Sequence, residues 1–229
     1  MRKTIAAVTV LVALLATASV ALATLTQTAT VLLTAHKANQ STGITATMRS
    51  SDASAPGGKP TAATGLVIGF PAGTKFNLIH SLAARCHYTD AQLVTRFGPT
   101  CPKKSQVGSG RAVANASPLA NPVNAVVAAY VRSATEMVFV VKPTLPGAPT
   151  IVIHAAVHGS RLTMPIPRIN LGGIAVVLVS LTLDVPKLGN GKHALIISGR
   201  CVARAFSVTS HFTYADGSTL NFTSSAPCR

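Results

Sequence analysis

The chain has 229 residues, with 20 Lys and Arg against 5 Asp and Glu, which gives a formal net charge of +15 at pH 7. Aromatic residues make up only 4% and Trp is absent, so a surface that stacks nucleic-acid bases is poorly supplied, and we expect no specific nucleic-acid partner. Five carboxylates are also few for a hydrolase that works with a carboxylate pair. The basic excess favours anionic polymers as partners.

The first residues have the pattern of an export signal. Arg2 and Lys3 precede the apolar run TIAAVTVLVALLATASV, and Ala21-Leu22-Ala23 provides the small residues that signal peptidase accepts. We predict a signal peptide over residues 1–23, with an uncleaved anchor as the alternative. After cleavage, 18 Lys and Arg and 5 acids remain, a formal charge of +13. No later apolar run reaches membrane length, so we expect no transmembrane segment in the mature chain.

Strands dominate the first half of the mature chain. Val, Ile and Thr between turn signals predict strands in 28–37, 42–50 and 61–70, with a Ser, Pro and Gly loop before the third. One short helix is predicted near 89–97, because Thr89 can serve as its N-cap and Gly-Pro follows it.

In the second half the strands follow one another closely. Strands are predicted within 110–116, 124–132, 136–142, 150–158 and 174–185. In 174–185, alternate residues from Ala175 to Leu183 share one apolar face. Asn190-Gly191 and Asp216-Gly217 each predict a two-residue hairpin turn.

This pattern predicts an all-β fold, an antiparallel immunoglobulin-like β-sandwich. Because a seven-stranded sandwich needs only about 100 residues, we expect two packed units, an N-terminal one over 24–120 and a C-terminal one over 121–229. A single sandwich with an insertion is the alternative.

The four cysteines are even in number and lie in a chain that we expect to be exported, so disulfides are predicted. Of three connectivities, the local spacing favours Cys86–Cys101 and Cys201–Cys228. Zinc is the rival interpretation, but no Cys-x-x-Cys pair exists. We expect neither a metal nor a cofactor.

Two further groups of residues suggest chemistry. The stretch CPKKSQVGSGRAVAN, residues 101–115, contains a cysteine, lysines and a Gly-Ser-Gly turn, but its glycines open a strand and not a helix, so we interpret it as scaffold. His154 and His158 would stand about 13 Å apart on one face of a strand, too far to share a metal ion. Of the five acids, only Glu136 and Asp184 have no obvious local role.

Three segments carry a resemblance that extends over most of the mature chain: residues 41–77, the motif CPKKSQVGSGRA, and FTYADGSTLNFTSSAPC near the end. In these segments the chain resembles a group of functionally uncharacterised exported proteins of high-GC actinobacteria. The resemblance implies export, disulfides and a β-sandwich, and it supplies no catalytic residues.

We therefore expect a non-catalytic protein, secreted or on the cell surface, that contacts anionic envelope polymers or surface proteins. One alternative is a carbohydrate- or small-ligand-binding module, for which Tyr88, Tyr130 and Tyr214 are the available aromatics. Another is a secreted hydrolase with a site assembled around His154, His211 or Glu136. Only the three-dimensional arrangement of these side chains can distinguish the alternatives.

Overall fold

The computed structural model describes residues 25–79, 84–95 and 100–229, so the predicted signal peptide lies outside the described residues. The strands are β1 (Leu25–Leu33), β2 (Ile44–Asp52), β3 (Ala63–Gly69), β4 (Lys75–Phe76), β5 (Gln106–Ala116), β6 (Ala120–Val131), β7 (Glu136–Pro143), β8 (Ile151–His158), β9 (Arg161–Pro165), β10 (Ile169–Leu171), β11 (Ile174–Val185), β12 (Ile196–Ile197), β13 (Ala205–Tyr214) and β14 (Thr219–Pro227). The helices are α1 (Asp90–Val94) and the single 3₁₀ turns Pro56–Gly58, Lys103–Ser105 and Gly191–His193.

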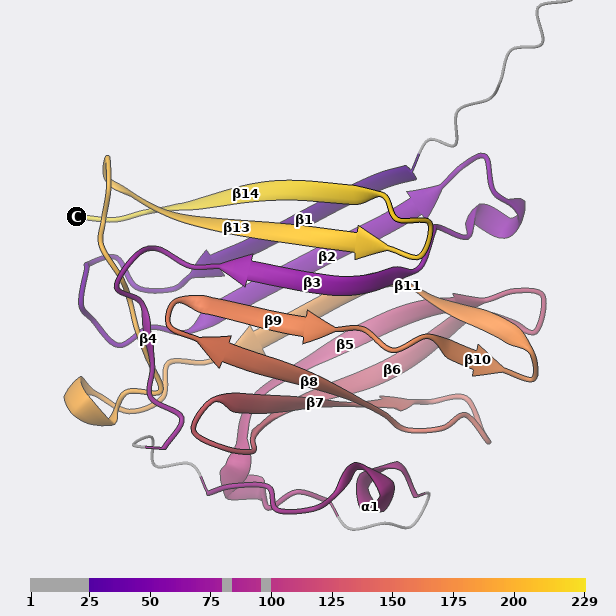
Figure 1. Cartoon of the computed structure of the whole chain (residues 1–229), viewed down its shortest axis with the longest axis horizontal. Coiled ribbons are helices and arrows are strands. Elements are labelled where there is room, and N and C mark those ends of the chain that lie inside the picture. The colour runs from indigo at the N-terminus through magenta and orange to yellow at the C-terminus, as the bar shows by residue number, and fades with distance from the viewer. Residues whose placement is uncertain (1–24, 80–83, 96–99) are drawn as a thin grey trace, which may run out of the picture.

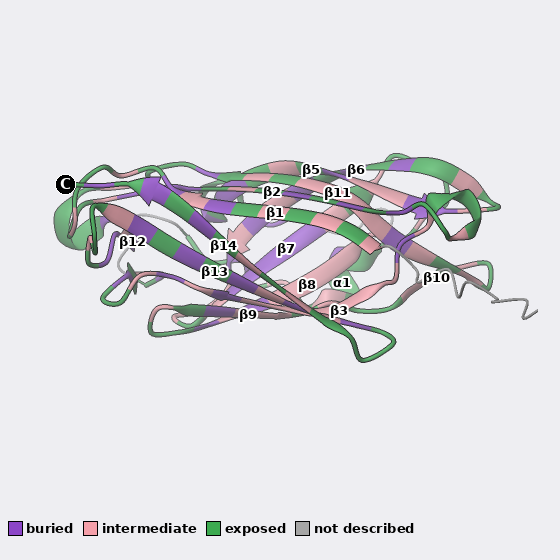
Figure 2. Ribbon diagram, turned by 90° about the horizontal axis from the view of Figure 1, so that it is seen from above, coloured by how far each residue is buried: buried purple, intermediate pink, exposed green. Residues whose placement is uncertain are grey.

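Twelve strands form one antiparallel sheet in the order β1-β2-β11-β5-β6-β7-β8-β9-β3-β13-β14, with β10 paired to β11. The sheet curls so far that its first and last strands come together (Figures 1 and 2). Their seam carries no strand ladder in the described chain, but the Val31 N–H donates to Ser224 Oγ across it at 3.1 Å. The sheet is therefore nearly closed.

The all-β, antiparallel prediction is confirmed, whereas the immunoglobulin-like sandwich and the two units are not. Strands from 24–120 and 121–229 alternate in the one sheet, because β11 lies between β2 and β5, and β3 lies between β9 and β13. The predicted boundary near residue 120 falls where β5 and β6 pair along their length. Non-local pairs of this kind leave no trace in the periodicity of a single strand.

Glycines and register shifts let the sheet bend at β5. A Cβ built on Gly110 would lie 3.0 Å from Leu183 Cα, and one on Gly108 would lie 2.9 Å from Asp184 O, so any side chain here would collide with β11. Register shifts occur between Leu178 and Ser180 on β11 and twice along the β5–β6 pair. Such irregularities increase the local bend and twist of a sheet, which favours its closure.

A second layer covers the outer face of β7 and β8. Val138 and Val140 point outward from β7, yet they are only 0% and 4% exposed. Residues Cys86, Leu93 and Cys101 pack with Val140 in a small apolar cluster. The middle of this strand, Met137 to Val140, is therefore buried on both faces of the sheet, although its inward and outward residues alternate as in any strand.

The predicted short helix is present as α1, and its capping box joins Thr89 to Gln92. The end of that prediction, at 96–97, lies outside the described residues. No helix in the described part of the chain combines the length and apolar character needed to cross a membrane.

The two hairpin predictions have different outcomes. The chain does turn at Asp216-Gly217 between β13 and β14, but residues 215–218 form the connection, which is longer than the predicted two residues. The Asn190-Gly191 prediction is wrong, because this segment forms a 3₁₀ turn inside a loop closed by the Leu195 N–H donating to Leu188 O at 2.9 Å. Ile196 and Ile197, which form β12, then pair with β4. The burial of Leu195 and Ile196 outweighs the turn signal of Asn190-Gly191.

Candidate functional site

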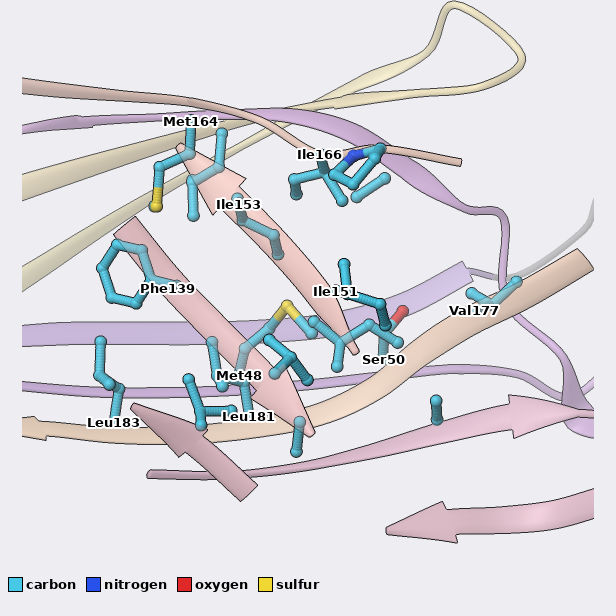
Figure 3. Close-up of a pocket in the computed structure, with 18 of the residues that line it drawn as sticks. Met48, Ser50, Phe139, Ile151, Ile153, Met164, Ile166, Val177, Leu181 and Leu183 are labelled. Carbon is cyan, nitrogen blue, oxygen red and sulfur yellow. The ribbon is translucent and has the colours of Figure 1, made fainter. Parts of the chain in front are cut away.

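The nearly closed sheet surrounds an apolar cavity of about 470 Å³. This volume lies in the range of about 300–1,000 Å³ that is typical of small-molecule sites. Side chains from different walls point into the same space, among them Phe139 of β7, Ile153 of β8 and Met48 of β2 (Figure 3). The cavity is the strongest candidate for a functional site.

Along most of the strands the lining follows the two-residue period, so that mainly one face of the strand reaches the cavity. The main contributions are Ile44, Ala46 and Met48 from β2; Ala112, Ala114 and Ala116 from β5; Val123, Ala125 and Val127 from β6; Met137, Phe139 and Val141 from β7; Ile151 and Ile153 from β8; and Leu178, Leu181 and Leu183 from β11. The part of the lining formed by β5 carries only alanine methyl groups, which extend little into the enclosed space. The cavity owes its width to these small residues.

One end of the cavity is filled by the two-stranded sheet of β4 and β12. Phe76 and Ile196 from these strands line the cavity, and Leu78 and Leu195 beside them are 1% and 0% exposed. Phe70 packs edge-on against Phe76, with ring centroids 5.2 Å apart. This end is closed to solvent.

The other end opens to solvent. Among the exposed residues that line the cavity are Pro149 after β7, Arg168 just before β10, Asn170 in β10, and Ala215 at the turn after β13. Segments far apart in the sequence therefore form the mouth of the cavity. Figure 1 shows β10 beside the first residues of β11, with which it pairs. Arg168 is the only charged side chain among the described residues of the lining.

Among the polar side chains that interrupt the apolar lining, two stand side by side on neighbouring strands. Gln27 on β1 and Ser50 on β2 face each other in the strand register and both line the cavity. The Tyr214 hydroxyl donates to Gln27 Oε1, and burial raises the pKa of Tyr214 to about 12, so the phenol keeps its proton. Gln27 Nε2 and Ser50 Oγ are buried and have no hydrogen-bond partner among the residues that the structure describes.

A separate cluster of ionisable groups lies on the outer face. His154 Nδ1 is 2.5 Å from Glu136 Oε1, and His154 Nε2 is 2.7 Å from Asp90 Oδ2. Arg132 donates to Asp90 Oδ1 at 2.6 Å and to the backbone oxygen of Tyr88 at 3.0 Å. The cluster attaches α1 and the preceding segment to β7 and β8.

The protonation states in this cluster follow from its contacts. Partial burial would lower the pKa of His154, but the hydrogen bonds and charges of Glu136 and Asp90 outweigh it and raise the pKa. Burial would raise the pKa of Asp90, but Arg132 and His154 lower it. When both ring nitrogens donate to carboxylates, the imidazolium has no lone pair for a metal or for general-base chemistry.

We expect a pH dependence of stability from this cluster. Because the pKa of His154 is raised in the folded protein, its contribution is complete below about pH 6.5 and is lost as the pH rises through the folded pKa. The His154→Gln variant should lose less stability than the parent between about pH 6 and pH 9, by about 1 kcal/mol or less for a half-exposed group. Urea unfolding at both pH values measures this difference.

His158→Gln is the matched control for that experiment. His158 lies on the same strand and the same face, is exposed, and belongs to no ion pair among the described residues. Its variant should follow the pH profile of the parent. A profile of His154→Gln identical to that of the parent would contradict the role assigned to the cluster.

The residues that the sequence suggested for a hydrolase do not assemble into one site. His154 and Glu136 meet, but on the outer face, whereas the cavity lies inside. His211 projects from β13, where its Nδ1 is 2.7 Å from Asn221 Oδ1. Because β9 and β3 lie between β8 and β13 in the sheet, these two strands are about 14 Å apart. Asp184 is exposed on β11. Among the described residues no group of three or more His, Cys, Asp or Glu could hold a metal ion.

The two predicted disulfides are confirmed. Cys86 and Cys101 are bonded with their Cα atoms 5.0 Å apart, and Cys201 and Cys228 are bonded with theirs 5.9 Å apart. The first joins the two ends of the outer layer, and the second joins the segments that flank the β13–β14 hairpin. The stretch 101–115 contains Cys101 of the first bridge, a 3₁₀ turn and most of β5, as expected of scaffold.

Sequence reasoning did not find the cavity. The only local signal is the alternation of small residues along β5, where Ala112, Ala114 and Ala116 all face inward. Gln27 and Ser50 carried no motif, and they become a pair only through the register of β1 on β2. None of the three tyrosines is exposed, so the aromatic surface that a carbohydrate-binding groove would need is not formed by them.

Comparison of the chain with protein-family models, with curated protein sequences and with solved structures found no match.

Proposed function

We propose that this protein is an exported, non-catalytic carrier or sensor that binds an apolar or amphipathic small molecule in its cavity. The observation that carries the proposal is the cavity itself, of about 470 Å³, lined almost entirely by Ala, Val, Ile, Leu, Met and Phe and open at one end. This proposal replaces envelope contact, which the sequence alone favoured, as the first candidate.

The packing of the side chains around the cavity supports ligand binding. Protein interiors normally fill their volume as tightly as organic crystals, and a void leaves the side chains around it without partners. Here the cavity extends between the strands that enclose it and is open to solvent at one end. A ligand can therefore enter and supply the van der Waals contacts that the lining side chains lack. Each Å² of apolar surface that ligand and wall remove from water contributes about 25 cal/mol to binding before the costs of association.

The remaining parts of the proposal have separate support. Export is supported by the predicted signal at 1–23 and by two disulfides, which persist in oxidising compartments. A non-catalytic role is supported by the position of the His154 cluster, which lies on the outer face with both ring nitrogens occupied.

Contact with anionic envelope polymers is a second candidate. Among the described residues only Arg132, of all the Lys and Arg side chains, forms an ion pair, and most of the others are exposed. The outer surface therefore carries a large uncompensated positive charge. A polyanion would bind such a surface weakly and in a salt-dependent way.

One titration tests both candidates. The purified, delipidated protein is mixed with the neutral apolar dye N-phenyl-1-naphthylamine or with dextran sulfate, across a salt series. We expect saturable dye binding at a single site with a Kd of about 1 μM that salt does not weaken. Because the chain has no Trp, intrinsic fluorescence contributes little background. Failure of the dye to saturate, with dextran sulfate binding at low salt only, would contradict the cavity proposal and favour the second candidate.

A further inference from the structure

We propose that the cavity selects ligands with a single carboxylate head on a long apolar tail, and that Gln27 and Ser50 bind the head. This inference rests on the proposed function and specifies the chemical class of ligand. It is carried by two buried polar atoms in the lining, Gln27 Nε2 and Ser50 Oγ, to which no described residue offers a hydrogen bond.

The two groups are placed to contact one head group together. Gln27 and Ser50 are directly opposite in the β1–β2 register, which puts their Cβ atoms about 5 Å apart. Both line the cavity, and Ser50 is only 5% exposed. Within the described part of the chain, Gln27 Nε2 and Ser50 Oγ are buried and have no hydrogen-bond partner. Figure 3 shows Ser50 beside Ile151, with its oxygen among apolar side chains.

Their chemistry favours an acceptor in the ligand. Tyr214 donates to Gln27 Oε1, so the amide presents its NH₂ group, which can only donate. The Ser50 hydroxyl can donate a second hydrogen bond. Two donors side by side match the two oxygens of a carboxylate, and the bonds are stronger for a charged acceptor than for a neutral one.

The charge of the lining favours an anion, although Asp52 follows Ser50 by two residues on β2 and its carboxylate accepts hydrogen bonds from Ser54. Among the described residues no Asp or Glu lines the cavity, and the one charged lining residue is Arg168 near the mouth. An anionic head at Gln27 and Ser50 therefore meets no carboxylate from the wall. The net positive charge of the chain adds attraction during approach.

The shape of the cavity favours a long tail. From Ser50, alternate residues of β2 line the cavity through Met48 and Ala46 to Ile44, a path of about 20 Å at 3.3 Å per residue. The path ends near the closed end formed by β4 and β12. A straight apolar chain fits a lining of this form, with its head at the polar pair.

The test compares three ligands with the same tail: palmitate, palmityl alcohol and methyl palmitate. Their affinities are measured by displacement of N-phenyl-1-naphthylamine from the whole protein. We expect palmitate to bind about 10- to 100-fold more tightly than the methyl ester. In Ser50→Ala and in Gln27→Met this preference should fall about tenfold, while affinity for the ester stays the same. Thr28→Val, an exposed position between the inward residues of β1, should retain the full preference.

The outcomes separate this inference from the proposed function. Equal affinities of the parent protein for the three ligands would overturn the carboxylate head but leave the apolar cavity as a binding site. A preference that persists in both variants would overturn the assignment to Gln27 and Ser50. Absence of binding by any of the three, together with no dye binding, would contradict the proposed function as well.

Discussion

Replacing Ala114 with Phe should lower the affinity for apolar ligands by about 100-fold, equivalent to about 3 kcal/mol of binding free energy. Ala114 lies on β5 between Leu178 of β11 and Val123 of β6, and its methyl group faces the cavity. A phenyl ring at this position would occupy the space that we assign to the ligand. Because that space is unfilled in the protein, the ring can enter it with little strain, and the fold should be retained.

The matched control is Val126→Phe. Val126 lies on the neighbouring strand but points outward and is 56% exposed, so the same ring adds bulk without reaching the cavity. Displacement titrations on both variants, with urea unfolding to verify that each is folded, measure the effect. If the Ala114 variant is folded and binds as tightly as the Val126 variant, the ligand does not occupy the cavity.

The second large effect concerns the Cys201–Cys228 disulfide. Replacing both cysteines with Ser should lower the free energy of unfolding by about 3.5 kcal/mol, from the closed loop of 27 residues in the chain-entropy account. The bridge also contributes to packing, because Cys228 is 6% exposed within the main core, and the Cys228 N–H donates to Arg204 O at 2.8 Å. Its loss should loosen the end of β14 that adjoins β1.

Urea unfolding of the parent protein and of the double Ser variant measures this difference. Under reducing conditions the two proteins should become alike, which distinguishes loss of the covalent link from loss of the thiol side chains. A difference below about 1 kcal/mol under oxidising conditions would show that the bridge does little to hold the hairpin in place.

The sequence predicted the features that depend on neighbours in the chain. Most of the expected strands are present within a few residues, the helix at 90–94 begins at its expected cap, Asp216-Gly217 forms its hairpin, and both disulfides join the expected pairs. Periodicity, capping and loop closure are local, so single-chain patterns report them directly.

The arrangement of the strands in space was not predictable in this way. Nothing in 174–185 indicates that this strand pairs with β2 on one side and β5 on the other, or that a register shift near Val179 keeps both Leu178 and Leu181 toward the cavity. The predicted alternation treated this strand as continuous. At Asn190-Gly191 tertiary packing replaced the expected hairpin with a 3₁₀ turn.

The candidate site was hidden for the same reason. A cavity is a property of several strands together, and the small residues of β5 matter only because the rest of the sheet curls around them. The pair formed by Gln27 and Ser50 depends on strand register, not on spacing in the chain. By contrast, the histidines can be identified in the sequence by residue type alone, which suggested a catalytic role for them. In the structure His154 forms ion pairs with Asp90 and Glu136.

The seam between the first and the last strand determines when the site can form. The hydrogen bond from Val31 to Ser224 joins residues 193 positions apart, so closure depends on contacts of very high sequence separation. Sheets that rely on such contacts have a high contact order and fold slowly, over milliseconds to seconds. The walls of the cavity become complete only after β13 and β14 have been synthesised and have docked beside β1. A nascent chain therefore has no binding site, and it acquires one in the step that completes its folding.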